Sequence, residues 1–147
     1  MSRRAQQAIL AAVIGVLLVA NVVVTHRFLT EPFPGHNDFL TPWEGARSFW
    51  IDGVPVYSDQ SNANIQTQIY GRPIEEGEFP NYFAYPFYTI VLMLPLVWMP
   101  YAWATAVWMV ALEACLIGAL FLLLDLYRWK PKPWMLVLLI VWMLFFY

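Results

Sequence analysis

The sequence has little charge, almost no cysteine and few residues that commonly bind metals. Of its 147 residues only 12% are charged, one is cysteine and two are histidine. A single cysteine excludes a disulfide framework within the chain, and His26 and His36 lack the ligand spacing of a zinc site. There is no glycine-rich phosphate-binding loop, and the net charge of −2 is not the excess of positive charge that is typical of nucleic-acid-binding proteins. We therefore expect no metal, no cofactor and no nucleic-acid partner.

Apolar residues, in contrast, are abundant and gathered into long runs. Hydrophobic residues make up 61% of the chain, more than ordinary soluble domains contain. The runs cover residues 8–25, 83–99, 102–124 and 133–147. This pattern predicts an all-α integral membrane protein with about four transmembrane helices, in which residues 1–147 form a single membrane module.

The first run has the properties of an uncleaved signal anchor. Its eighteen residues would form a helix of about 27 Å, close to the hydrocarbon thickness of about 30 Å. It has no small-residue cleavage site and leads directly into His26 and Arg27. Arg3 and Arg4 precede it, which predicts a cytoplasmic N-terminus in the plasma (inner) membrane.

Residues 26–82 form the only extended polar segment, which we expect on the external or periplasmic side. This segment contains eight acidic residues and only three arginines, so its net charge is negative. If all four runs cross the membrane, Arg128, Lys130 and Lys132 lie outside, against the usual preference for cytoplasmic cations. If residues 83–99, which contain Pro86 and Pro95, are instead re-entrant, these cations lie inside. The prediction is four crossings, with the re-entrant arrangement as the alternative.

A short amphipathic helix is expected inside this loop. Thr41, Pro42 and Glu44 have the spacing of a capping box with proline at the first helical position, and Gly53 suits the end of a helix. About eleven residues would be helical, with Trp and Phe on one face and Glu44, Arg47 and Ser48 on the other. Such a face suits either the headgroup boundary or the surface of the membrane-embedded helices.

Two polar elements of the loop can be combined. The first surrounds Asp38, and the second is Phe83-Ala84-Tyr85-Pro86 at the start of a hydrophobic run. Taken separately, a turn-forming aspartate and interfacial tyrosines are ordinary features of a membrane protein. Their order and spacing are more specific, and involve Asp38-Phe39, Trp43, Ala46, Gly53, Pro55, Tyr57, Phe83-Ala84-Tyr85-Pro86 and Leu94-Pro95.

This pattern resembles the N-terminal part of the C-type (GT-C) glycosyltransferases of family 87, which include polyprenyl-phosphate-mannose-dependent alpha-mannosyltransferases. The resemblance covers about residues 8–124. It implies a cell-envelope transferase that moves a sugar, such as mannose, from a polyprenyl-phosphate donor to an acceptor hydroxyl at the external membrane face. These enzymes normally have many more membrane helices, so the module is expected to be incomplete relative to a full enzyme.

The resemblance implies that Asp38 is the catalytic general base, because the acceptor hydroxyl must lose a proton as it attacks the anomeric carbon. Tyr85, in the second element, is a candidate substrate-binding residue. His36, Arg47 and Arg72 are candidate donor-binding residues by chemistry alone, since a cation would stabilise the phosphate leaving group.

The run 102–124 contains one cysteine and one acidic residue inside its apolar sequence. Cys115 is expected to be a packing residue. Glu113 lies in the middle of the run, where a charge costs about 3 kcal/mol, so it should be neutral, paired or facing a polar cavity. Glu113 has two alternative roles: it pairs with a helix outside this chain, or it takes part in catalysis. The alternative function is a small non-catalytic subunit that contacts other membrane subunits through aromatic faces and Glu113.

Overall fold

The structure is a computed structural model that describes residues 2–35 and 38–145, with the side chains of residues 144 and 145 excepted. The chain divides into two units. The terminal unit contains residues 1–25 and 106–147, and the loop unit contains residues 26–105. His36, one of the candidate donor-binding residues, lies outside the described residues.

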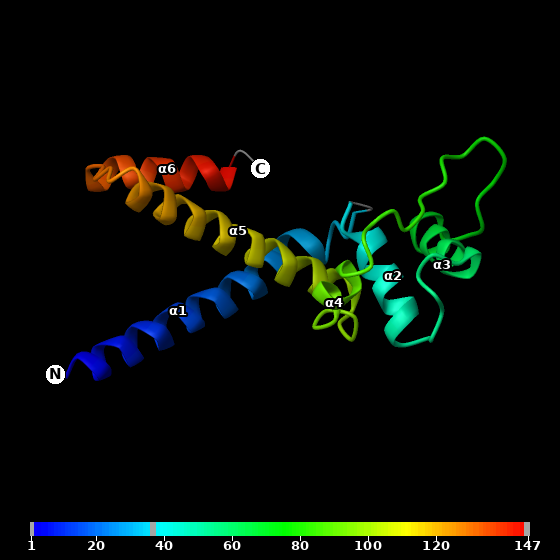
Figure 1. The fold of residues 1–147 in the computed structure, drawn as a ribbon, viewed down its shortest axis with the longest axis horizontal. Coiled ribbons are helices and arrows are strands. Elements are labelled where there is room, and N and C mark those ends of the chain that lie inside the picture. The colour runs from blue at the N-terminus through cyan, green and yellow to red at the C-terminus, as the bar shows by residue number, and fades with distance from the viewer. Residues whose placement is uncertain (1, 36–37, 146–147) are drawn as a thin grey trace. The chain divides into compact units, whose positions relative to one another are not determined.

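All regular elements in the described part of the chain are helices, and no strand occurs there, so the all-α prediction is confirmed for it (Figure 1). The helices are α1 (Arg3–Thr25), η1 (His26–Thr30), α2 (Leu40–Trp50), α3 (Asp59–Tyr70), α4 (Thr89–Met93), α5 (Tyr101–Leu126) and α6 (Pro133–Phe145). The element η1 is a π-helix that continues directly from α1.

Two of these helices are long and apolar enough to cross a membrane. One is α1 together with η1, over residues 3–30, and the other is α5. Their apolar side chains are largely exposed, for example Leu17 at 62% and Leu122 at 74%, whereas the core helix of a soluble protein would bury them. The predicted runs 8–25 and 102–124 lie inside these helices.

Within the described residues, the other two predicted crossings do not form helices of spanning length. Within residues 83–99 only α4 is helical, and its five residues span about 7.5 Å. Pro86 and Pro95 bracket it, and each lacks the N–H that a continuous helix would need. Helix α6 has thirteen residues, or about 20 Å. The four crossings are therefore not confirmed.

A chain of polar contacts joins the two long helices of the terminal unit. The Asn21 side-chain amide on α1 donates to Oε2 of Glu113 on α5 at 3.0 Å, and Thr25 Oγ1 donates to the Asn21 side-chain oxygen at 3.4 Å. Glu113 thus has a polar partner within its own chain. Pairing with a separate subunit stays a prediction, as does a catalytic role.

Helix α2 organises the loop unit by packing against α3 and α4 (Figure 1). It has the predicted eleven residues but begins at Leu40, with Phe39 as an N-cap that makes no side-chain capping bond. The predicted capping box of Thr41 and Glu44 is wrong, because both residues lie within the helix. Pro42 is accommodated since amides of the first turn have no intrahelical acceptor.

Burial on α2 is not confined to the apolar face. Trp43 and Ala46 of the apolar face are buried, at 3% and 0% exposure, and so are Glu44 at 4% and Ser48 at 0%. The face opposite the tryptophan and phenylalanine side chains is therefore not exposed at Glu44 and Ser48. Helix α3 is the cause, because it covers the face of α2 that would otherwise be polar and exposed.

Helix α3 itself is not anticipated by the sequence analysis. Its N-cap is Ser58, whose Oγ accepts a hydrogen bond from the Ser61 amide at 3.2 Å, and its C-cap is Gly71 with a φ of 68°. These are ordinary start and stop signals. Before the terminal Tyr70, helix α3 has only two large apolar residues, Ile65 and Ile69, so hydrophobic periodicity gives little sign of it.

Candidate functional site

The two elements on which the family resemblance depends lie together in the loop unit. The Tyr85 hydroxyl donates a hydrogen bond to the backbone carbonyl of Asp38 at 3.2 Å. Burial raises the pKa of Tyr85, and the negative charge of Asp38 raises it further, so the phenol remains a hydrogen-bond donor at neutral pH. The Asp38 side chain is exposed. The contact uses only the Asp38 backbone, so Tyr85 does not occupy the carboxylate oxygens.

The segment around Tyr85 is held by close packing against α2. Phe83 is 4% exposed and lies over Gly45, where an added Cβ would clash with the Phe83 ring. Glycine is therefore required for this approach of ring to helix. The Phe83 ring also makes edge contacts with Tyr57 and Tyr85, each with ring centroids 5.6 Å apart.

Hydrogen bonds fix the same segment from α3 and the preceding loop. The Phe83 amide donates to the Asn62 side-chain oxygen at 3.3 Å, and the Gln66 side-chain amide donates to the Asn81 carbonyl at 2.9 Å. The Tyr57 hydroxyl donates to the Tyr85 carbonyl at 2.8 Å. The position of the Tyr85 side chain beside Asp38 is thus determined by both α2 and α3.

Two indole groups of α2 connect it to the proline-interrupted segment. Trp43 Nε1 donates to the Leu96 carbonyl at 3.1 Å, and Trp50 Nε1 donates to the Ile90 carbonyl at 2.9 Å. Backbone carbonyls outside a long helix need such partners when they are buried. The two bonds let residues 89–97 pack without a continuous helix.

The candidate arginines have other partners. Arg72 forms ion pairs with Glu75 and Glu78, and the hydrogen bond from Arg72 lowers the pKa of Glu78. The Arg47 guanidinium lies 5.8 Å from the centroid of the Trp43 ring. In the part of the chain that the structure describes, neither arginine interacts with Asp38, so only Tyr85 of the proposed binding residues is brought to it.

Glu44 is a candidate that the sequence analysis places wrongly. Its Oε1 accepts from Ser48 Oγ at 3.4 Å, and Ser48 Oγ in turn accepts from the Asn64 amide at 2.9 Å. Its Oε2 is buried without a hydrogen-bond partner among the described residues. Burial raises the pKa of Glu44, and the charge of Asp52 raises it further, whereas Arg47 and the Ser48 hydrogen bond lower it.

Stability should therefore depend on the protonation of Glu44. Because its folded-state pKa is raised above the ordinary value of 4.5, the free energy of unfolding should fall as the pH rises above about 4.5 towards the folded-state pKa. A shift of one pKa unit corresponds to about 1.4 kcal/mol. We expect Glu44→Gln to abolish this part of the pH dependence, measured as thermal unfolding of the full chain between pH 4 and pH 8.

Glu76→Gln is the matched control, because Glu76 is exposed and its removal takes away the same charge without relieving burial. The prediction fails if Glu44→Gln and Glu76→Gln change the pH dependence equally. The sequence does contain a signal for the burial of Glu44. Gly45 follows it directly and Ser48 lies one helical turn later, and these two small residues form a face on which a second helix can pack.

Among the described residues, no group of three or more His, Cys, Asp or Glu side chains is arranged so that it could hold a metal ion.

The comparisons with known proteins return nothing: no family model, no curated protein and no solved structure matches this chain.

Proposed function

We propose that this chain is a membrane glycosyltransferase, or the N-terminal part of one, that transfers a hexose such as mannose from a polyprenyl-phosphate donor to an acceptor hydroxyl at the external membrane face. The observation that carries the proposal is the hydrogen bond from Tyr85 to the Asp38 carbonyl, which joins the two elements of the family pattern. An exposed carboxylate beside a neutral phenol is a suitable arrangement for accepting a proton from a bound hydroxyl.

In this reaction the Asp38 carboxylate accepts the hydroxyl proton of the acceptor as its oxygen attacks the anomeric carbon. The bond between that carbon and the phosphate oxygen breaks, and the lipid phosphate leaves with the bonding electron pair. Tyr85 fixes the backbone of Asp38 and offers a neutral surface to the sugar. Arg47 is the cation of the loop unit nearest in sequence to Asp38 that has no ion pair among the described residues, and it is our candidate for the phosphate.

The assay is transfer of radiolabelled mannose from polyprenyl-phosphate mannose, using membranes that contain the protein as it occurs in its source. Label in a lipid or glycan product, absent from membranes without the gene, supports the proposal. No transfer of mannose or of another hexose from its polyprenyl phosphate would contradict it.

We also propose that α1 and α5 are the two membrane crossings, with the N-terminus in the cytoplasm and the loop unit outside. Both helices have sufficient length and exposed apolar surface. With two crossings Arg128, Lys130 and Lys132 lie on the same side as Arg3 and Arg4, in agreement with the preference for cytoplasmic cations. The charge conflict of the four-crossing arrangement disappears.

Labelling of single cysteines tests this topology. In a Cys115→Ala background, an impermeant maleimide applied to intact cells should label Gln60→Cys, whereas Ser2→Cys and Lys132→Cys should react only after the membrane is opened. Four crossings predict instead that Lys132→Cys labels together with Gln60→Cys. That outcome would replace the two-crossing arrangement.

The alternative function, a non-catalytic subunit of a membrane complex, is favoured by aromatic side chains that the loop unit leaves uncovered. Phe79 is 86% exposed, and Tyr88 and Trp98 are also exposed. Such side chains are typical of protein interfaces as well as of membrane interfaces. This alternative predicts co-purification at fixed stoichiometry and no requirement for the Asp38 carboxylate, while an intact mass well above 17.1 kDa for the natural protein favours the enzyme.

A further inference from the structure

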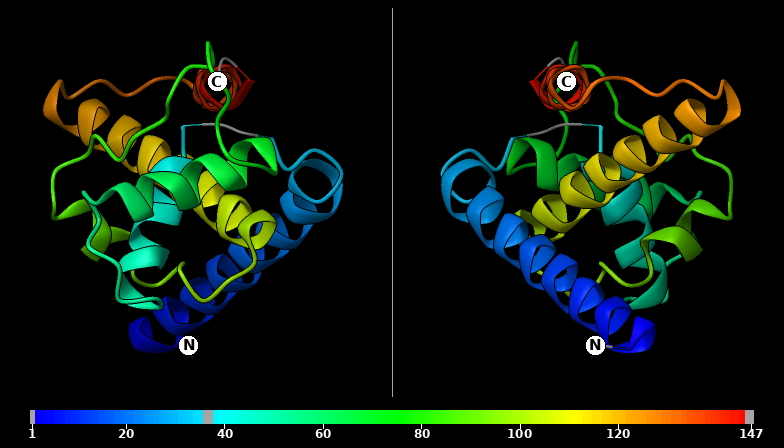
Figure 2. Two further views of the ribbon diagram at one scale, coloured as in Figure 1. Left: turned by 90° about the vertical axis from the view of Figure 1, so that its right-hand side faces the viewer. Right: turned by 90° about the vertical axis from the view of Figure 1, so that its left-hand side faces the viewer.

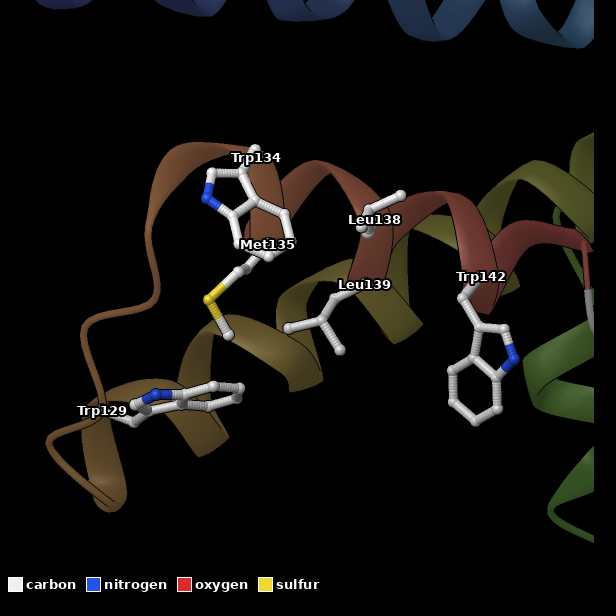
Figure 3. Close-up of a pocket in the computed structure, with 6 residues that line it drawn as sticks. All are labelled: Trp129, Trp134, Met135, Leu138, Leu139 and Trp142. Atoms are coloured by element: carbon white, nitrogen blue, oxygen red, sulfur yellow. The ribbon is translucent and has the colours of Figure 1, made fainter.

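The turn that follows α5 contains an apolar groove within the terminal unit. Its volume is about 430 Å³, within the range of pockets that hold small molecules. In Figure 3, Met135, Leu139 and Trp142 project from α6 towards the side on which the Trp129 ring lies. The groove is lined by Trp129, Trp134, Met135, Leu138, Leu139 and Trp142. The lining from α6 follows helical spacing, so one face of the helix forms most of the groove.

A second hollow, of about 560 Å³, shares Trp129 with the groove and has a different chemistry. Leu124, Asp125, Arg128, Trp129 and Lys130 line it. Both cations are exposed, and neither forms an ion pair with any residue in the described ranges. Lys132, two residues further along the chain, is also exposed. The two hollows therefore place a cationic surface next to an aromatic and aliphatic one.

Arg128 is held at this position by a strained backbone. Its φ of 50° makes it the one non-glycine residue with positive φ among those described. It ends α5 in a Schellman arrangement, in which the Trp129 amide donates to the Leu124 carbonyl at 2.9 Å and the Arg128 amide donates to the Asp125 carbonyl at 3.0 Å. Glycine is the ordinary residue here, because a side chain costs energy in this conformation. Strain of this kind often marks a functional position.

The chain reverses direction between α5 and α6 (Figure 1), and Figure 2 shows α6 end-on after the connecting loop. If α5 crosses the membrane, this turn lies at the bilayer surface, since the helix ends at Leu126 and is followed by charged residues. Tryptophan prefers that depth, and lysine and arginine there attract anionic lipid.

We propose that the α5–α6 turn is a binding site for an anionic glycerophospholipid of the cytoplasmic leaflet. The lipid phosphate binds Arg128 and Lys130, and one acyl chain lies along Trp129, Leu139 and Trp142 in the groove. The positive charges of Arg128 and Lys130 favour an anionic headgroup. Because the cationic and apolar hollows adjoin at Trp129, the site favours a lipid over a soluble anion. This site goes beyond the proposed transferase activity, and it rests on the two-crossing arrangement proposed above, which places the α5–α6 turn on the cytoplasmic side.

The test is lipid retention by the full chain, released for native mass spectrometry from micelles containing equal amounts of phosphatidylglycerol and phosphatidylcholine with identical acyl chains. We expect preferential retention of phosphatidylglycerol. Each cation near an anionic lipid surface contributes about fivefold, so Arg128→Gln with Lys130→Gln should lower that retention about thirtyfold. Arg3→Gln with Arg4→Gln removes the same charge from the other cationic segment and should have little effect.

Two further arms separate the site from general effects on the fold. Arg128→Gly removes the backbone strain, so it should unfold at a higher temperature than the parent yet retain about fivefold less phosphatidylglycerol. Inorganic phosphate should not displace the lipid. The proposal is overturned by equal retention of the two lipids, by equal losses in the two double variants, by displacement with inorganic phosphate, or by a co-purifying protein that occupies the turn instead. None of these outcomes bears on Asp38.

Discussion

Replacing Asp38 with asparagine is expected to reduce sugar transfer by about 10²–10⁴-fold, the usual contribution of a general base. Asparagine has nearly the same shape but accepts no proton at neutral pH. The fold should be unaffected, because the Asp38 side chain is exposed and the bond from Tyr85 goes to its backbone carbonyl. The loss should appear in kcat more than in KM, since the proton is transferred only as the acceptor attacks.

Asp59→Asn is the matched control, because Asp59 is an exposed aspartate of the same unit and lies in the first turn of α3. Transfer by this variant should remain within about twofold of the parent, because Asp59 does not belong to the proposed site. Removing one exposed charge from a first turn should lower the stability of the helix by only about 0.3–1 kcal/mol. Thermal unfolding of the two variants should differ little. Full activity in Asp38→Asn would remove the base assignment and favour the non-catalytic alternative.

Replacing Trp43 with alanine should have the largest effect on stability, a loss of about 3–5 kcal/mol. Trp43 is 3% exposed, and its ring packs 5.2 Å from the ring of Tyr101. Alanine leaves a cavity at that place and also leaves the Leu96 carbonyl without the indole donor. The Arg47 guanidinium loses the ring over which it lies.

Denaturant unfolding of the full chain in detergent, followed by the helical circular dichroism signal, measures this loss. Trp98→Ala is the control, because Trp98 belongs to the same unit but is 66% exposed, so its removal should cost less than about 1 kcal/mol. Trp43→Phe retains most of the packing and removes only the donor, so an intermediate loss is expected. Equal losses for Trp43→Ala and Trp98→Ala would show that α2 is not anchored as described.

Hydropathy correctly predicts the long helices because their signal is local. The runs at residues 8–25 and 102–124 are uninterrupted, and each lies inside a helix of sufficient length. Residues 83–99 are apolar too, but hydropathy does not register that Pro86 and Pro95 remove amides that a helix of spanning length requires. Two backbone carbonyls of this segment, those of Leu96 and Ile90, instead accept hydrogen bonds from Trp43 and Trp50, which lie far away in the sequence.

The errors at the candidate site have a common physical origin. The capping-box spacing and the amphipathic pattern place Glu44 at a cap and opposite the apolar face, and both treat α2 as an isolated helix. Its burial depends on α3, whose polar composition gives no periodic signal. The approach of Tyr85 to Asp38 depends likewise on Gly45 and Phe83, a tertiary contact that the order of motifs suggests but does not determine.

The two indole bonds of α2 also constrain when the loop unit can fold during synthesis. Trp50 and Ile90 are 40 residues apart in the chain, and Trp43 and Leu96 are 53 apart. A chain that emerges from its N-terminus therefore exposes α2 while the carbonyl partners are still inside the ribosome. During that interval the Trp43 and Trp50 side chains are exposed, so they can bind the membrane surface or a chaperone. Slowing translation between residues 50 and 97 should prolong this exposed state without altering the final structure.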